Sequence, residues 1–88
     1  MSSEPFDVAW SATARRSMGR LPEKVGTAAV EFIYGPLAVN PRRVGKALRF
    51  EMSGLHSARR GDFRIIYRIT DIVTIVAIEH RADAYRPR

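Results

Sequence analysis

Apolar residues recur at regular spacings along most of the chain, and each spacing predicts an element. Residues 6–10 alternate between large apolar and smaller or polar side chains, which predicts a short strand. Residues 12–21 carry apolar side chains at helical spacing, and residues 23–33 carry a second such stripe. A proline between the two stripes ends one helix and suits the first turn of the next, so we expect a helix hairpin. Gly35-Pro36 should break or kink the second helix.

The second half of the chain has the pattern of strands and turns. Residues 40–47 contain proline, glycine and three basic residues, which predicts a loop. Residues 48–52 and 55–60 predict strand segments on either side of a Ser-Gly turn. Residues 72–78 are nearly all β-branched or apolar, which predicts a central strand that is covered on both faces.

The strand expected over residues 63–69 has two chemically different faces. A Gly-Asp pair precedes it and a Thr-Asp pair follows it, and both pairs are typical of turns. The opposite face from its apolar residues carries Arg64 and Arg68. Alternation places four residues on the apolar face: Phe63, Ile65, Tyr67 and Ile69.

These elements predict an α+β fold with one domain over residues 1–88: an N-terminal strand, a helix hairpin and a three-strand antiparallel meander. A single layer of helices covers only one face of a sheet. The helices should therefore lie on the aromatic face and leave the face with Arg64 and Arg68 open. The pairing partner of the first strand stays open at this point.

Composition removes several classes of function. The 88 residues include no cysteine, which excludes a disulfide scaffold and thiolate metal ligands. His56 and His80 lie far apart, and no cluster has metal-ligand spacing, so we expect no metal and no cofactor. No apolar run reaches the roughly 18 residues of a membrane helix, and no secretory signal begins the chain. We therefore expect a cytoplasmic protein without a membrane partner.

Positive charge is confined to one half of the chain. Residues 1–40 hold four basic and four acidic residues, whereas residues 41–88 hold eleven basic and five acidic ones. The whole net charge of +6 thus lies in the second half, and thirteen of the fifteen basic residues are arginine. Arginine favours bidentate contact with phosphate. This distribution predicts a polyanionic partner, with nucleic acid first and an acidic protein second; a merely solubilising surface does not explain the confinement.

Two groups of residues are candidates for anion chemistry. A hairpin about Gly61-Asp62 would bring Arg59 or Arg60 opposite Arg64, and like charges across a ladder repel unless an anion lies between them. Structural alternatives stay open, because such arginines are also common as solvated edge charges. The second group follows the last strand directly and has structural alternatives as a strand cap, an ion pair and a packed ring: His80, Arg81 and Tyr85.

From Asn40 to Arg86 the chain resembles the RelE branch of the RelE/ParE superfamily of bacterial toxins, and the order of helices before this segment fits as well. The matching pieces occur in the family's order: Asn40-Pro41, Gly45-Lys46 with Leu48, Ser53-Gly54-Leu55, Arg59, Gly61-Asp62-Phe63-Arg64-Ile65-Ile66-Tyr67, His80-Arg81, Asp83 and Tyr85-Arg86.

This resemblance implies a toxin that cleaves mRNA in the ribosomal A site and is neutralised by a RelB-like antitoxin from a neighbouring gene. It implies no metal: the ribose 2′-hydroxyl attacks the adjacent phosphate and leaves a 2′,3′-cyclic phosphate and a 5′-hydroxyl. Fixed guanidinium groups suit the negative charge that such a reaction develops. A ParE-like inhibitor of DNA gyrase and an inactive antitoxin-binding module are the alternatives.

The resemblance also implies roles for individual residues. Arg64 and Arg81 match phosphate-contacting arginines, Tyr85 matches a tyrosine that stacks on a base or aids proton transfer, and His80 is suited to moving protons. Ser57 stands where well-known members carry lysine or arginine, so the general base stays open between Tyr85 and His80. The remaining basic residues are predicted RNA contacts: Arg42, Arg43, Lys46, Arg59, Arg60, Arg68 and Arg86.

Overall fold

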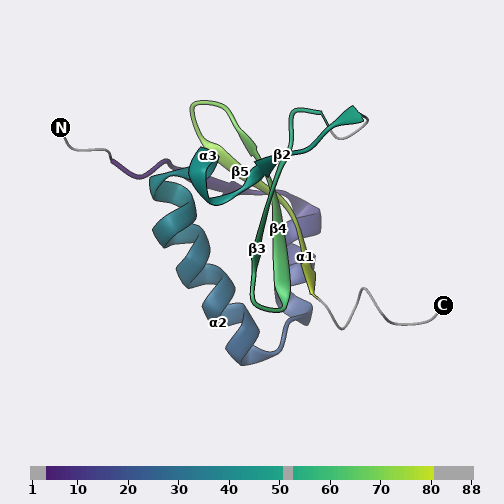
Figure 1. Cartoon of the computed structure of the whole chain (residues 1–88). Helices are drawn as coiled ribbons and strands as arrows, with labels where there is room; N and C mark the ends of the chain where they lie inside the picture. Colours follow the sequence, from purple (N-terminus) through teal and green to yellow (C-terminus); the bar gives the residue numbers. More distant parts are fainter. Residues whose placement is uncertain (1–3, 51–52, 81–88) are drawn as a thin grey trace.

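The computed structural model describes residues 4–50 and 53–80 (Figure 1). Its elements follow one another in this order: β1 (Val8–Trp10), α1 (Ala12–Arg20), α2 (Glu23–Phe32), the kinked helical segment η1 (Ile33–Leu37), α3 (Pro41–Val44), β2 (Lys46–Ala47), β3 (His56–Arg60), β4 (Phe63–Ile69) and β5 (Val73–His80). None of the helices in the described ranges is long and apolar enough to cross a membrane.

The sheet has five strands within the described residues, in the order β1-β5-β4-β3-β2. The antiparallel meander of β3, β4 and β5 is confirmed, and so are the turns that join them. Two further strands extend it, because β2 pairs with β3 at one edge and β1 pairs with β5 at the other. The partner of the first strand, which the sequence left open, is therefore β5, and the pairing is parallel.

The predicted helix hairpin is present, and local chemistry explains its limits. The side chain of Ser11 caps α1 by accepting a hydrogen bond of 3.0 Å from the backbone N–H of Ala14. Pro22 separates the two helices as predicted, but it occupies the N-cap position immediately before α2 rather than its first turn. The predicted kink occurs at Gly35, whose φ and ψ of −104° and −106° lie outside the helical range.

The core lies between the helices and the predicted face of β4. Figure 1 shows α2 along one flank of the sheet and α1 behind β4 and β5. One cluster of buried side chains joins Ala14 of α1 and Phe32 of α2 to Ile65 and Tyr67 of β4. The rings of Phe32 and Phe63 meet edge to face at 6.5 Å. The helices therefore cover the aromatic face, as the alternation predicted.

The prediction that β5 is covered on both faces is wrong. Val73, Ile75 and Ile78 are buried against the helices, but Val76 and Ala77 stay half-buried. An apolar strand can be central within a sheet while only one of its faces has a second layer. The sheet face opposite the helices is thus open, as expected for a two-layer fold.

Residues 40–52 also differ from the prediction. Residues 40–47 do not form a plain loop, because they contain the one-turn helix α3 and the strand β2. The strand expected from Leu48 is displaced toward the N-terminus, and Phe50 adopts a positive φ of 60° that no strand allows. Residues 51 and 52 lie outside the described residues. Tertiary contacts decide this segment, since neither α3 nor β2 is long enough to be stable alone.

Tyr67 is the contact that holds this segment. Its side chain is fully buried, its hydroxyl donates a 2.6 Å hydrogen bond to the carbonyl oxygen of Pro41, and its ring stacks on His56. Burial raises the pKa of the Tyr67 phenol to about 12. The hydrogen bond anchors α3, which carries Arg42 and Arg43, to the middle of β4.

We expect this phenol to make the free energy of unfolding depend on alkaline pH. The folded pKa of about 12 exceeds the ordinary value of 10.0, so its contribution is complete below pH 10 and is lost as pH rises toward 12. The loss should be about 3 kcal/mol. Urea unfolding should show Tyr67→Phe to be less stable by about 1 kcal/mol at neutral pH, with the difference vanishing or reversing near pH 12. A difference that does not change with pH would contradict this.

Candidate nucleic-acid interface

A β-bulge in β5 determines which of its side chains reach the open face of the sheet. Ile66 of β4 lies opposite Ala77, but the next residue, Tyr67, lies opposite Ile75, so Val76 is the extra residue. The hydroxyl of Ser11 donates a 2.7 Å hydrogen bond to the carbonyl oxygen of Val76 and holds the bulge against the start of α1.

Three charged residues form a row across the open face beyond this bulge. Arg59 of β3 lies directly opposite Arg64 of β4, and Arg64 lies opposite Glu79 of β5. Nη2 of Arg64 is 3.0 Å from Oε1 of Glu79, and about half of each side chain is exposed. The predicted arginine pair therefore exists. The anion beside it is the carboxylate of Glu79, which lies on the far side of Arg64 and not between the two arginines.

Further basic residues extend this surface. Lys46 pairs with Ser57, and Ser57 with Ile66, so the Lys46 side chain shares the open face. Arg68 lies on it opposite Thr74. The open face, opposite the helices, consists of the side chains that alternation places there: Lys46, Ser57, Arg59, Arg64, Ile66, Arg68, Thr74, Ala77 and Glu79.

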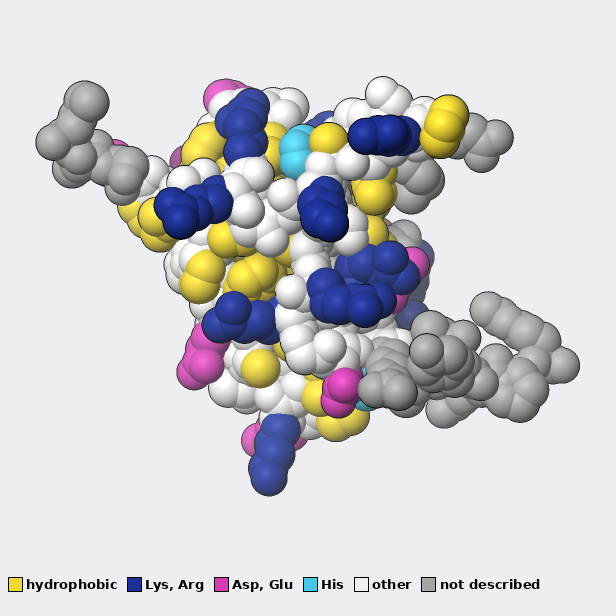
Figure 2. All heavy atoms as spheres, in the orientation of Figure 1, with side chains coloured by type: hydrophobic (Ala, Val, Ile, Leu, Met, Phe, Trp, Pro, Cys, Tyr) yellow, Lys and Arg dark blue, Asp and Glu magenta, His cyan; other side chains and the backbone are white. Residues whose placement is uncertain are grey.

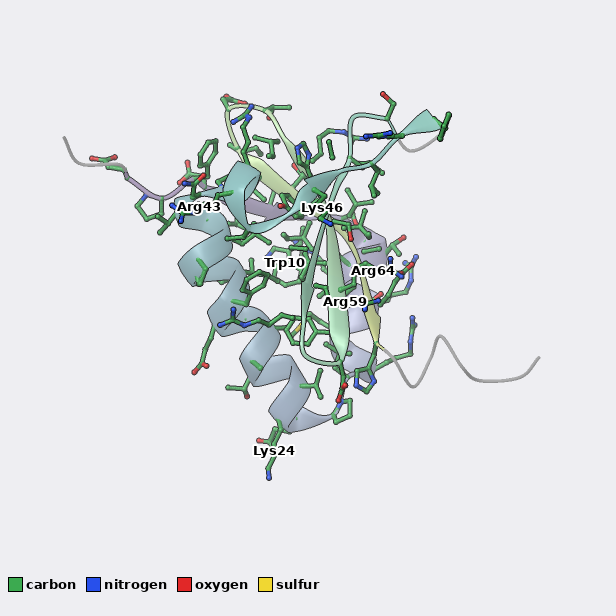
Figure 3. All side chains as sticks on the ribbon, in the orientation of Figure 1. Trp10, Lys24, Arg43, Lys46, Arg59 and Arg64 are labelled. Carbon is green, nitrogen blue, oxygen red and sulfur yellow. The ribbon has the colours of Figure 1, made fainter. Side chains whose placement is uncertain are left out.

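Lys and Arg side chains are spread over the side of the molecule that Figure 2 shows, with few acidic side chains among them. Figure 3 shows Arg59 and Arg64 close together on β3 and β4, Lys46 beyond them and Arg43 farther along. Arg42 and Arg43 are both exposed on α3. Basic residues from three separate stretches of the chain thus form one extended surface of the kind that binds a phosphodiester backbone.

Arg60 does not share this surface with Arg59. It pairs with Phe63 at the end of the hairpin, and its guanidinium carbon lies 5.1 Å from the centre of the Phe32 ring on the helix side. Adjacent residues of a strand point to opposite faces, so the sequence already contained this distinction. Arg60 is predicted to contact RNA, and such a contact requires RNA to extend around the end of the sheet to the helix side.

His80 also lies on the helix side at the end of its strand. Its partner across the ladder is Phe63, whose side chain belongs to the core, whereas Arg64 points to the other face. The other histidine, His56, stacks on Tyr67 at 5.6 Å and is a packing residue. Neither histidine therefore shares a surface with Arg64. Three predicted site residues fall outside the described residues: Arg81, Tyr85 and Arg86.

Sequence reasoning did not select Glu79 as a site residue, although it is the acidic member of the row. The sequence shows that Glu79 directly precedes His80, but it does not show on which face of the sheet the Glu79 side chain lies. The bulge that determines this face lies within an unbroken apolar run. Residues 4–50 and 53–80 contain no group of three or more His, Asp or Glu side chains that could hold a metal ion.

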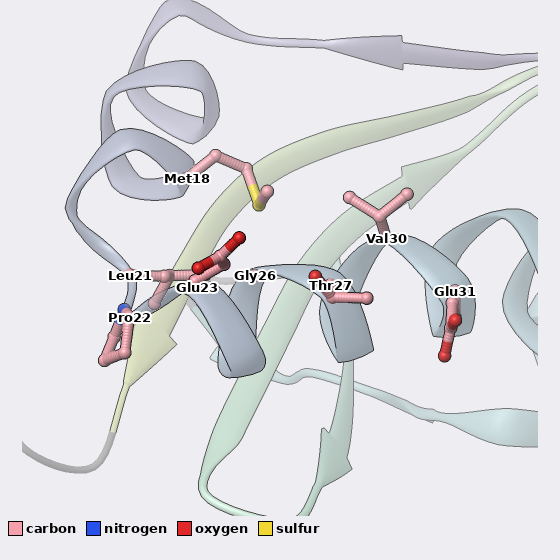
Figure 4. A pocket seen from close by; sticks show the side chains of 8 residues that line it. All are labelled: Met18, Leu21, Pro22, Glu23, Gly26, Thr27, Val30 and Glu31. Carbon is pink, nitrogen blue, oxygen red and sulfur yellow. The ribbon is translucent and has the colours of Figure 1, made fainter.

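A groove of about 420 Å³ lies in the helix layer, away from the open face (Figure 4). Met18, Leu21 and Val30 provide apolar walls, and Glu23 and Glu31 add two carboxylates. Carboxylates repel phosphate, so this groove does not fit a nucleic-acid backbone. The open face is the candidate interface.

Comparison with known proteins agrees with the resemblance of the sequence. Residues 8–85 match the profile of a family described as the ParE toxin of type II toxin–antitoxin systems, parDE. Toxin RelE of Mycobacterium tuberculosis (strain ATCC 25618 / H37Rv) is 53% identical over 85 residues, which cover 93% of this chain and 88% of that protein. Toxin RelG of the same strain is 48% identical over 85 residues, which cover 93% of this chain and 98% of that protein. The chain belongs to the RelE/ParE family of type II toxins.

The fold of the toxin agrees with this assignment. The crystal structure of the toxin–antitoxin complex RelBE2 from Mycobacterium tuberculosis matches with a TM-score of 0.88 and 45% identity, covering 93% of this chain and 98% of that chain. The family match includes β3, β4 and β5 entirely, so the open face belongs to the family domain of the toxin.

Proposed function

We propose that this toxin is an endoribonuclease that cleaves mRNA in the A site of translating ribosomes, in the cytoplasm. The observation that carries the proposal is the row of Arg59 and Arg64 on an exposed, basic sheet face. Guanidinium groups at one strand spacing suit the two non-bridging phosphate oxygens, which become more negative when the 2′-hydroxyl attacks phosphorus. The 53% identity to a protein called Toxin RelE supports the same assignment.

The proposed roles follow the positions of the side chains. Arg64 binds the scissile phosphate, and Arg59, Lys46 and Arg68 hold the flanking backbone. Arg42, Arg43 and Arg86 extend the contact with RNA, in agreement with the charge of the second half of the chain. Arg81 contacts the phosphate or the leaving group, and Tyr85 stacks on a base. The reaction needs neither a metal nor a cofactor.

The direct test uses purified ribosomes that carry a defined mRNA. We expect cleavage only when ribosomes are present, in the A-site codon, with 2′,3′-cyclic phosphate and 5′-hydroxyl ends. Cleavage should persist in a chelator at a concentration that leaves the ribosomes intact. Products with 5′-phosphate ends would contradict attack by the 2′-hydroxyl.

The name of the matched family gives a specific reason to test one alternative, the inhibition of DNA gyrase. Induction in growing cells separates the two functions, because an mRNA endonuclease stops translation first and a gyrase inhibitor stops replication first. Early loss of amino-acid incorporation, with DNA synthesis continuing, is the result we expect. Unimpaired growth on induction of folded toxin would indicate an inactive antitoxin-binding module.

We also propose a RelB-like, acidic antitoxin from a neighbouring gene as the protein partner. A structure with 45% identity to this chain is that of a toxin–antitoxin complex. The net charge of +6 and the exposed arginines of the open face suit a partner of opposite charge.

Binding of this antitoxin should be fast and sensitive to salt. Raising salt from about 50 to about 500 mM shortens the Debye length severalfold, so the association rate in stopped-flow mixing should fall. The complex should melt at a higher temperature than the free toxin, because the antitoxin binds only the folded state. An association rate that is independent of salt would show that the antitoxin does not bind to the basic surface.

A further inference from the structure

Glu79 places a carboxylate on the otherwise basic open face. It lies directly across from Arg64, and the two side chains form an ion pair of 3.0 Å in which both partners stay about half exposed. Exposed ion pairs contribute little to stability. The stability of the fold therefore does not explain why this surface carries a carboxylate beside its arginine pair.

The bulge at Val76 gives Glu79 its orientation. Val73 and Ile75 point into the core, and uninterrupted alternation would send the Glu79 side chain to that same face. The extra residue reverses the alternation, so that Ile78 is buried and Glu79 faces Arg64 instead. Bulges commonly redirect a side chain next to an active site.

Cleavage by the 2′-hydroxyl requires a group that accepts the hydroxyl proton. Arginine stays protonated, lysine is ordinarily protonated at neutral pH, and serine and threonine hydroxyls are very weak bases. Within residues 4–50 and 53–80, Glu79 is the one side chain of the open face that can accept a proton. Two other charged side chains lie in the same row across the sheet: Arg64 on the neighbouring strand and Arg59 on the strand after that.

We propose that Glu79 is the general base of mRNA cleavage, an inference that rests on the proposed function. The carboxylate takes the proton of the 2′-hydroxyl while the 2′ oxygen forms its bond to phosphorus. The bond from phosphorus to the 5′ oxygen breaks, its electron pair stays on that oxygen, and the oxygen takes a proton from water. Arg64 binds the phosphate and fixes the carboxylate beside it, so base and anion-binding group are one strand spacing apart.

The test compares two variants at Glu79 under single-turnover conditions on programmed ribosomes. Glu79→Gln keeps the size of the side chain and a hydrogen bond to Arg64 but does not accept a proton, and Glu79→Asp keeps the carboxylate. Glu31→Gln, at an exposed position of α2, makes the same charge change in the helix layer and is the matched control. Equal melting temperatures of all proteins exclude a difference in folding.

We expect Glu79→Gln to cleave about 10²-fold more slowly or worse, Glu79→Asp to recover much of the rate, and Glu31→Gln to match the wild type. Hydroxide must replace the missing base, so the rate of Glu79→Gln should rise about tenfold per pH unit between about pH 6 and 8 while the wild-type rate stays level.

Two results for the variants would overturn the proposal. Cleavage by Glu79→Gln at the wild-type rate would show that no base was lost. Slow cleavage with the pH profile of the wild type would show that Glu79 only holds Arg64 in place. A wild-type protein that leaves ribosome-bound mRNA intact would instead contradict the proposed endonuclease, and the assignment of a base with it.

Discussion

Arg64→Ala should slow mRNA cleavage on ribosomes by about 10²- to 10³-fold, because it removes a fixed positive charge at the phosphate in the transition state. Arg59→Ala, which changes the opposing member of the pair, should weaken binding and cleavage in the same direction. The fold should persist, since the ion pair lost with Arg64 is half exposed. In cells, the Arg64 variant should relieve growth arrest at equal expression.

Arg60→Ala is the matched control for this prediction. It is adjacent to Arg59 on β3 and removes the same charge, but from the side of the sheet that faces Phe32. We expect it to cleave at nearly the wild-type rate and to lose at most about 1 kcal/mol of stability. Equal defects in the Arg59 and Arg60 variants would show that total charge, and not the open face, determines activity.

Gly45→Ala should be strongly destabilising. A β-carbon at Gly45 would overlap the Tyr67 hydroxyl and lie 2.7 Å from the carbonyl oxygen of Ser57. The carbonyl belongs to β3 opposite Lys46, so it moves only if the β2–β3 pairing breaks. We expect a loss of about 3 kcal/mol or more, which corresponds to a melting temperature lower by about 12 °C or more for a domain of this size.

Gly19→Ala provides the opposite control. Nothing lies within 4 Å of a β-carbon at Gly19, which is in α1. Alanine there should raise stability by up to about 1 kcal/mol through helix propensity.

Tyr67→Phe removes the oxygen that a β-carbon at Gly45 would overlap, so it should partly rescue the stability of Gly45→Ala, and the two effects on the free energy of unfolding should not add. Additive effects in urea unfolding would contradict the predicted overlap.

The features of this protein that depend on local spacing could be predicted from its amino-acid sequence. Strict alternation over residues 63–69 sorted the core residues of β4 from Arg64 and Arg68, and the structure confirms both faces. The turn at Gly61 has a positive φ of 58°, a conformation that favours glycine. Of the two arginines predicted to lie opposite Arg64, Arg59 is the one that does. The same alternation separates Arg59 from Arg60, although the prediction did not use it.

Other features depend on contacts between residues that are distant in the sequence. The helix α3 and the strand β2 are too short to be stable by propensity, and they form because Tyr67 binds Pro41 and β3 pairs with β2. The parallel pairing of β1 with β5 joins segments more than sixty residues apart, and no local pattern encodes such a register.

The orientation of Glu79 is the clearest case of tertiary control. An unbroken apolar run does not reveal which residue a strand will bulge out, so counting along residues 73–79 places this side chain on the wrong face. The bulge forms where the hydroxyl of Ser11, 65 residues earlier than Val76, reaches its carbonyl oxygen. The arginines of the candidate site can therefore be predicted from the sequence. The orientation of their carboxylate partner instead depends on the three-dimensional packing of α1 against β5.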